Sequence, residues 1–61
     1  MEQSKAKKIF LETMMQYPTR ATENFNTIMT LANILSKAEA VGFKLDPESV
    51  EKALKNVMAV D

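Results

Sequence analysis

The feature that most constrains this sequence is how rarely its helical pattern is interrupted. The chain has one glycine, Gly42, and two prolines, Pro18 and Pro47. A proline keeps the residue before it out of the α region and also suits the first turn of a new helix, while glycine readily takes the left-handed conformation that ends one. The sequence lacks the alternation of β-branched and polar residues that predicts a strand. We therefore predict an all-α fold of three helices, at about residues 4–16, 20–41 and 47–60.

Local signals at the predicted helix ends agree with this division. Asp46, Pro47 and Glu48 supply a capping carboxylate, a proline at the first helical position and an acid in the first turn, in that order. Phe43, which follows the glycine, is placed to fold back on the preceding turn in a Schellman motif. Thr19 is the expected N-cap of the middle helix, with Thr22 as a second candidate one turn on.

The three predicted helices differ in how much of their circumference is apolar. On a helical wheel the last helix carries one stripe of roughly 160°, which a single packing partner can bury. The first two helices are apolar over roughly 240° of their circumference. A surface helix usually has a narrower apolar stripe, from about 100° upward. They therefore need neighbours on two sides. The stripe of the last helix consists of Val50, Ala53, Leu54, Val57 and Met58.

The small size of the chain indicates where those neighbours come from. A domain of 61 residues buries only about 60% of the surface that its unfolded chain exposes, so small domains usually rely on disulfides, a metal or self-association. The chain has no cysteine and no histidine, which excludes disulfides and makes a metal site improbable. We predict a single domain, residues 1–61, that is completed by self-association, with a dimer as the first expectation.

The predicted interface lies on the apolar faces of the first two helices. Met14 and Met15 point about 100° apart on the first helix, so one of the two is expected to be exposed. Glu39 falls on the apolar side of the middle helix and is expected at the edge of an interface, paired with a lysine from another helix. The predicted interface residues are Phe10, Met14, Ile28, Leu31, Ile34, Leu35 and Ala38.

The residue inventory argues against catalysis. Without cysteine or histidine the serines lack a base that could activate them, and one glycine cannot build a phosphate-binding loop. No pair of carboxylates occupies an apolar wall where burial would raise the pKa of one of them. We therefore expect no enzyme activity and no cofactor. The expected function is protein–protein contact, as a regulator, adaptor, inhibitor or structural subunit. A third interpretation is that the contact face binds a different protein.

The alternative function is a dimeric nucleic-acid-binding regulator. A helix, a glycine turn and a second helix form the outline of a helix-turn-helix, but the turn is long and the last helix opens with acidic residues that would face phosphates. Eight basic residues balance eight acidic ones, which argues against nucleic acid as a partner. The alternative predicts retention on heparin that weakens steeply with salt. The residues that would carry it are Lys5, Lys7, Lys8 and Arg20.

No segment predicts a membrane span or a secretion signal. The longest uncharged stretch, residues 24–36, is well short of the roughly 20 apolar residues that a span needs. The apolar run after the basic N-terminal segment meets Glu12 at once, so no signal-peptide core forms. We expect no membrane partner and a cytoplasmic location.

One short segment resembles a known type of domain. Residues 40–48 resemble the helix-turn-helix ends of leader-peptide domains associated with nitrogen-fixation clusters, through a Gly-Phe pair that precedes a capped helix start. The chain has no Gly-Gly cleavage signal, since its one glycine is Gly42. Many helical domains share the Gly-Phe and capping features for reasons of packing, so no function is carried over from the resemblance.

Overall fold

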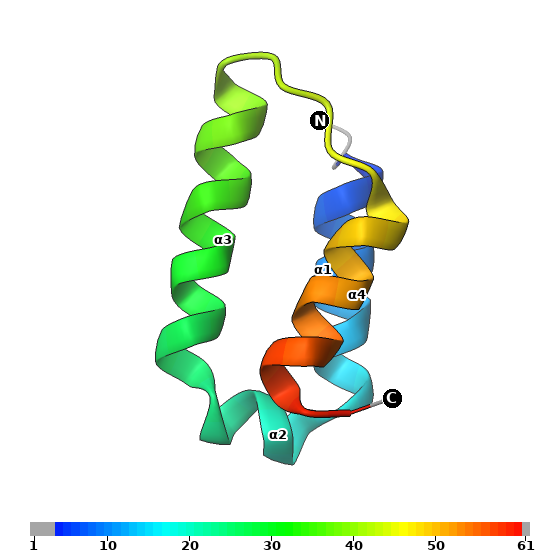
Figure 1. Ribbon diagram of the computed structural model, residues 1–61, viewed down its shortest axis with the longest axis vertical. Coiled ribbons are helices and arrows are strands. Elements are labelled where there is room, and N and C mark those ends of the chain that lie inside the picture. The colour runs from blue at the N-terminus through cyan, green and yellow to red at the C-terminus, as the bar shows by residue number, and fades with distance from the viewer. Residues whose placement is uncertain (1–3, 61) are drawn as a thin grey trace.

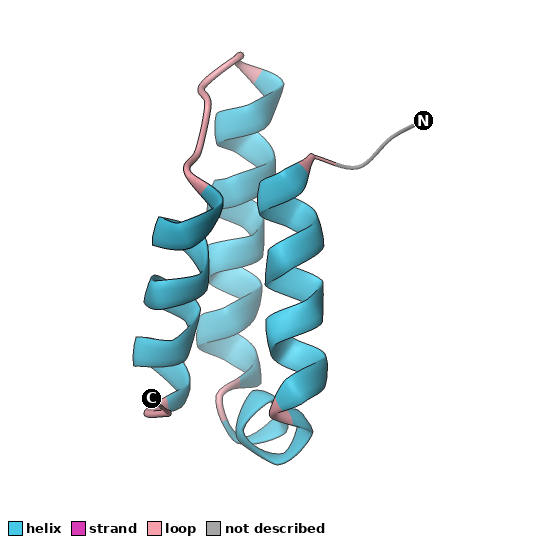
Figure 2. Cartoon of the chain, turned by 90° about the vertical axis from the view of Figure 1, so that its right-hand side faces the viewer, coloured by secondary structure: helices cyan, strands magenta, loops and turns pink. Residues whose placement is uncertain are grey.

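The computed structural model describes residues 4–60, which form four helices and no strand. This confirms the predicted all-α class. Three longer helices lie side by side, and a short one crosses the end at which the first of them finishes (Figures 1 and 2). The helices are α1 (Lys5–Gln16), α2 (Pro18–Glu23), α3 (Phe25–Ala40) and α4 (Pro47–Met58).

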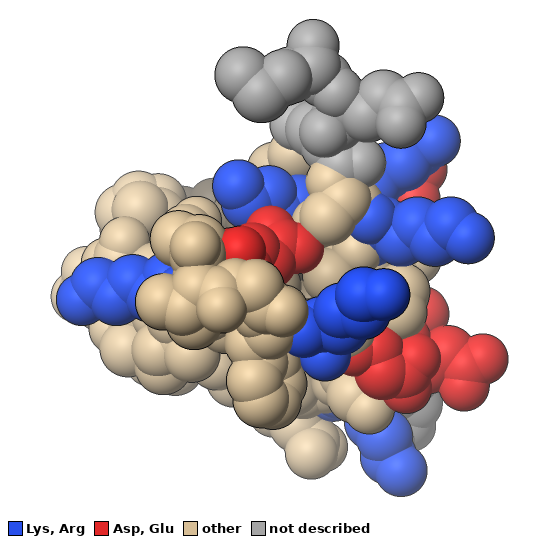
Figure 3. Space-filling model, turned by 90° about the horizontal axis from the view of Figure 1, so that it is seen from above, with Lys and Arg blue, Asp and Glu red and all other residues tan. Residues whose placement is uncertain are grey.

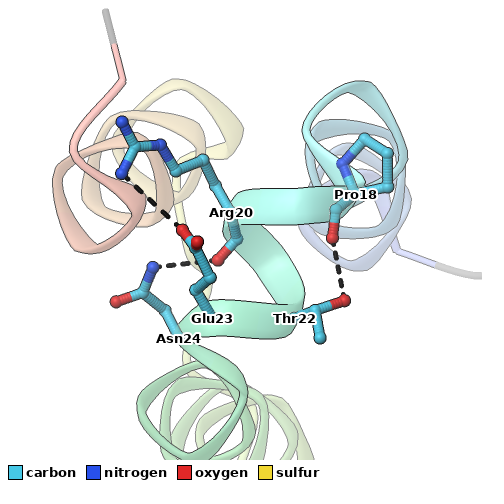
Figure 4. A network of polar contacts seen from close by, with 5 residues as sticks. All are labelled: Pro18, Arg20, Thr22, Glu23 and Asn24. Carbon is cyan, nitrogen blue, oxygen red and sulfur yellow. Dashed lines mark hydrogen bonds and ion pairs between the residues drawn. The ribbon is translucent and has the colours of Figure 1, made fainter.

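The predicted count of three helices was wrong, because the segment expected to form one helix over 20–41 forms two. The break is at Asn24, whose backbone dihedrals are φ −115° and ψ 27°. The Asn24 side-chain amide donates to the carbonyl of Arg20 (2.8 Å), and the Thr22 hydroxyl donates to the carbonyl of Pro18 (2.9 Å; Figure 4). Such side-chain bonds to carbonyls one turn back compete with the helical ladder and bend helices.

The break also changes how the segment packs. A straight helix over 20–41 would extend about 33 Å at 1.5 Å per residue, whereas the broken segment fits within a molecule of 31 Å along its long axis. The break lets α2 cross the end of the bundle and bury Ala21. The helix also begins earlier than expected, with Pro18 at its first position. Thr19 and Thr22 are therefore inside α2, and neither is an N-cap.

The end of α3 follows the predicted signal, whereas the cap at the start of α1 was not predicted. Ser4 is the N-cap of α1, where its hydroxyl accepts a hydrogen bond from the Lys7 backbone N–H (3.1 Å). Gly42 has φ +83°, and the Phe43 N–H donates to the carbonyl of Ala38 (2.9 Å). This is the Schellman geometry that the sequence predicts after α3.

The ends of α4 differ in detail from the prediction. Asp46 is at the N-cap position, but its carboxylate accepts from the Ser49 hydroxyl (3.1 Å) and makes no side-chain capping bond to the backbone. The helix ends at Met58, two residues early, because Ala59 takes a left-handed conformation with φ +57°. The Val60 N–H then donates to the carbonyl of Lys55 (3.0 Å), and the Val60 side chain packs against the core.

The core lies mainly between α1 and α4, which pack closely along their length, whereas α3 approaches them at fewer points. Among residues 4–60, one polar side chain is buried: the Thr13 hydroxyl donates to the carbonyl of Ile9 (2.7 Å), so burial leaves that hydroxyl satisfied. The buried apolar residues are Ala6, Phe10, Ala21, Ile28, Leu35, Leu54 and Met58.

Candidate interaction surface

Large apolar side chains remain exposed on two of the helices and on one turn. Such residues are ordinary when they occur singly, but contiguous patches mark interaction sites. Among the described residues, none of the large exposed apolar side chains belongs to α2 or α4. They are Leu11 and Met15 on α1, Phe25, Met29 and Ile34 on α3, and Val41 and Phe43 on the turn that follows α3.

Four of these residues lie on one side of the α1–α3 pair. A small hollow between the two helices is lined by Leu11 on α1 and by Ala32 and Ser36 on α3. Met15 follows Leu11 by one turn on the same side of α1. Met29 and Phe25 lie three and seven residues before Ala32, on the same side of α3. We call Leu11, Met15, Phe25 and Met29, together with Ala32 and Ser36 of the hollow, the α1/α3 face. Lys7 also lines this hollow.

A second apolar feature is a groove of about 230 Å³ between α3 and α4. Phe10 and Leu35, which are buried, form its floor. Ile34, 58% exposed, contributes from α3, and Val50 contributes from α4. We call this the α3/α4 groove; its remaining lining residues are Leu31, Leu45, Asp46, Ser49 and Ala53.

The seven predicted interface residues are spread over three environments. Phe10, Ile28 and Leu35 lie in the core of the chain itself. Met14, Leu31 and Ala38 are half-buried. Ile34 is exposed at the α3/α4 groove. The structure therefore assigns most of these side chains to the packing of the protomer, and only Ile34 presents a largely free surface.

Sequence reasoning missed all four large residues of the α1/α3 face. Both stripes of the middle helix are apolar, and the helical wheel alone does not tell which one turns inward. One signal was available on α1, since Met14 and Met15 point apart and one was expected to be exposed. The structure identifies that residue as Met15, which is 77% exposed, whereas Met14 packs against the core.

The basic residues do not form a single surface. The Lys7 ammonium on α1 lies 3.8 Å from the Glu39 carboxylate on α3. This confirms that Glu39 pairs with a lysine of another helix, here within the same chain. Arg20 lies on α2 at the opposite end of the molecule from Lys5 and Lys7, and it pairs with Glu23 (3.7 Å; Figures 1 and 4). Viewed from the end where α1 and α4 begin, blue and red side chains lie next to one another, and the α3 side is mostly tan (Figure 3).

The polar chemistry over residues 4–60 is sparse. No group of three or more His, Cys, Asp or Glu side chains in this range is arranged to hold a metal ion. The Lys55 ammonium lies 3.1 Å from the Glu51 carboxylate, and this hydrogen bond and charge raise the pKa of Lys55 above its ordinary 10.5. No helix in the described range is both long and apolar enough to cross a membrane.

Comparisons of the chain with protein-family models, with curated proteins and with solved structures find no match. The resemblance of residues 40–48 to leader-peptide domains therefore stays a prediction. A functional argument for this chain rests on its own surface and its own packing.

Proposed function

We propose that this chain acts by binding protein through the α1/α3 face, as a small cytoplasmic regulator, adaptor, inhibitor or structural subunit without a cofactor or chemistry of its own. The observation that carries the proposal is the clustering of Leu11, Met15, Phe25 and Met29, all exposed, on two adjacent helices. Exposed aromatic and methionine side chains are typical of binding surfaces, where a partner buries them in apolar contacts and excludes water.

The contrast with α4 supports this proposal. That helix has a core-facing stripe of ordinary width, and it leaves no large apolar side chain exposed. The surplus apolar surface is therefore local to α1 and α3, and it does not reflect a generally poor core. A local surplus is the pattern expected when a surface has a partner.

Site-specific photo-crosslinking in the producing cells tests the proposal. We expect Met15→benzoylphenylalanine to form adducts whose partner is identified by mass spectrometry, because the side chain at this position would lie inside the contact. The matched control is Asn56→benzoylphenylalanine, at an exposed position on the polar side of α4. Equal or absent adduct formation at the two positions would show that the α1/α3 face is not a contact surface.

The alternative, binding of nucleic acid, has one supporting observation. Lys5, Lys7 and Lys44 line an open hollow of about 730 Å³ at the end where α1 and α4 begin. Glu39 lines the same hollow and is paired with Lys7. This negative charge weakens the attraction of the hollow for phosphate. We therefore rank this function second.

A further inference from the structure

Resting on the proposed function, we infer that the occupant of the α1/α3 face is a second copy of this chain, related to the first by a two-fold axis. In such a dimer the same face is used by both copies, so the face must be complementary to itself in shape, polarity and charge. Three observations point to this occupant.

The first observation is the apolar character of the face. Its four large side chains are all apolar, and they are 43–77% exposed in the single chain. Homodimer interfaces are more apolar than the interfaces of proteins that associate transiently, which supports a second copy as the occupant.

The second observation is the absence of charge on the α3 part of the face. No Asp, Glu, Lys or Arg occurs from Phe25 to Ser36, three turns of α3. A face that meets its own copy brings each charged residue close to its equivalent, and like charges in that position repel. The uncharged part of α3 avoids this repulsion. It would also offer no attractive charge to a strongly charged partner.

The third observation is the pair of charges beside the α1 part of the face. Lys8 and Glu12 are both exposed, and they lie one turn before Leu11 and Met15 respectively. Lys7, which lines the hollow of the face, is paired with Glu39 of the same chain. Beside that pair, Lys8 and Glu12 form a self-complementary rim, since a two-fold axis can bring Lys8 of each copy to Glu12 of the other. A strongly basic or acidic partner would meet an unfavourable charge at one of these two positions.

The α3/α4 groove is the competing site, and it is the weaker one. It offers one largely exposed apolar side chain, Ile34, while Phe10 and Leu35 in its floor already belong to the core. It therefore provides the matched control: Ile34→Glu adds a charge on the same helix but outside the α1/α3 face.

Light-scattering mass after size exclusion, over a hundredfold dilution, tests the inference, with far-UV circular dichroism as the check of folding. We expect the wild-type chain to show twice its 6.9 kDa at high concentration. Met15→Glu would place two carboxylates in the dimer interface, one from each copy. We expect it to raise the dimer Kd at least about tenfold, while helicity at high concentration is retained. Ile34→Glu should leave the Kd unchanged.

Two results would overturn the inference. One is a folded wild-type monomer at every concentration, and the other is a dimer that Ile34→Glu dissociates and Met15→Glu does not. A monomer that still crosslinks to a different protein through position 15 would rule out a second copy as the occupant but support the proposed function. A monomer without crosslinks at position 15 would rule out both the second copy and the proposed function.

Discussion

Helices α3 and α4 contribute to the molecule in different ways. In α4 two of the twelve residues, Leu54 and Met58, are completely buried, and every large apolar side chain faces inward at least in part. The longer α3 also buries two residues, Ile28 and Leu35, yet it leaves three large apolar side chains exposed. The more apolar helix is thus the less completely buried one.

The difference teaches that apolar content and contribution to the core are separate properties. The core is set by how closely helix axes approach, and α4 lies close to α1 while α3 stands further off. Side chains of α3 outside the contact line therefore stay in water, however apolar they are. We assign the inward residues of both helices to folding, and we propose that Phe25 and Met29, two of the outward residues of α3, serve association.

The largest expected effect comes from truncating the buried residues of both helices. Leu54→Ala and Ile28→Ala should each lower the free energy of unfolding by about 3 kcal/mol, since both side chains are fully buried and each substitution leaves a cavity. Ile34→Ala removes a mostly exposed side chain and should cost less than about 1 kcal/mol. Urea denaturation followed by circular dichroism at one fixed protein concentration measures all three.

Ile28 and Ile34 form a matched pair, because they are the same residue type in the same helix. Equal losses of stability for the two would contradict the assignment of α3 residues to inward and outward roles. A loss at Leu54 much larger than the loss at Ile28 would instead show that α3 adds little to the core.

The next largest effect concerns the left-handed residues that follow α3 and α4. Gly42→Ala should cost about 1 kcal/mol, because an added Cβ meets no atom within 4 Å, so the loss comes from the positive φ alone. Ala59→Gly should gain a similar amount, about 0.5–1 kcal/mol, because Ala59 already has φ +57°. Thermal unfolding of the two variants should shift in opposite directions. Shifts in the same direction would be inconsistent with this account.

The smallest effect concerns the ion pair on α4. The Glu51 carboxylate raises the pKa of Lys55, so the stabilisation is present below the ordinary value of 10.5 and is lost as pH rises through the raised pKa of Lys55. Glu51→Gln should move that pKa back towards 10.5, as followed by NMR titration of the Lys55 side chain. Glu48→Gln, on the same helix, is the control and should leave the pKa of Lys55 unchanged. An unmoved pKa in Glu51→Gln would show that the contact at 3.1 Å is not populated in solution.

Most of the helix ends could be predicted because their causes are local. Gly42 and Pro47 act through their own dihedral preferences, and the structure has both in the expected roles. The break at Asn24 has a local cause as well, in its side-chain bond to Arg20, but the apolar pattern continues through it and hides it. Periodicity therefore merged α2 and α3.

The sequence by itself determined that the chain is all-α, where three of its helices start or stop, and that α4 has one apolar stripe while the segments of α1 and α3 have more. Only the tertiary structure decided which stripe of α3 turns inward, which made Ile28 core and left Phe25 and Met29 in water. The physical reason is that helical periodicity fixes the angles between side chains on one helix. The rotation of that helix about its axis depends on the neighbours it packs against.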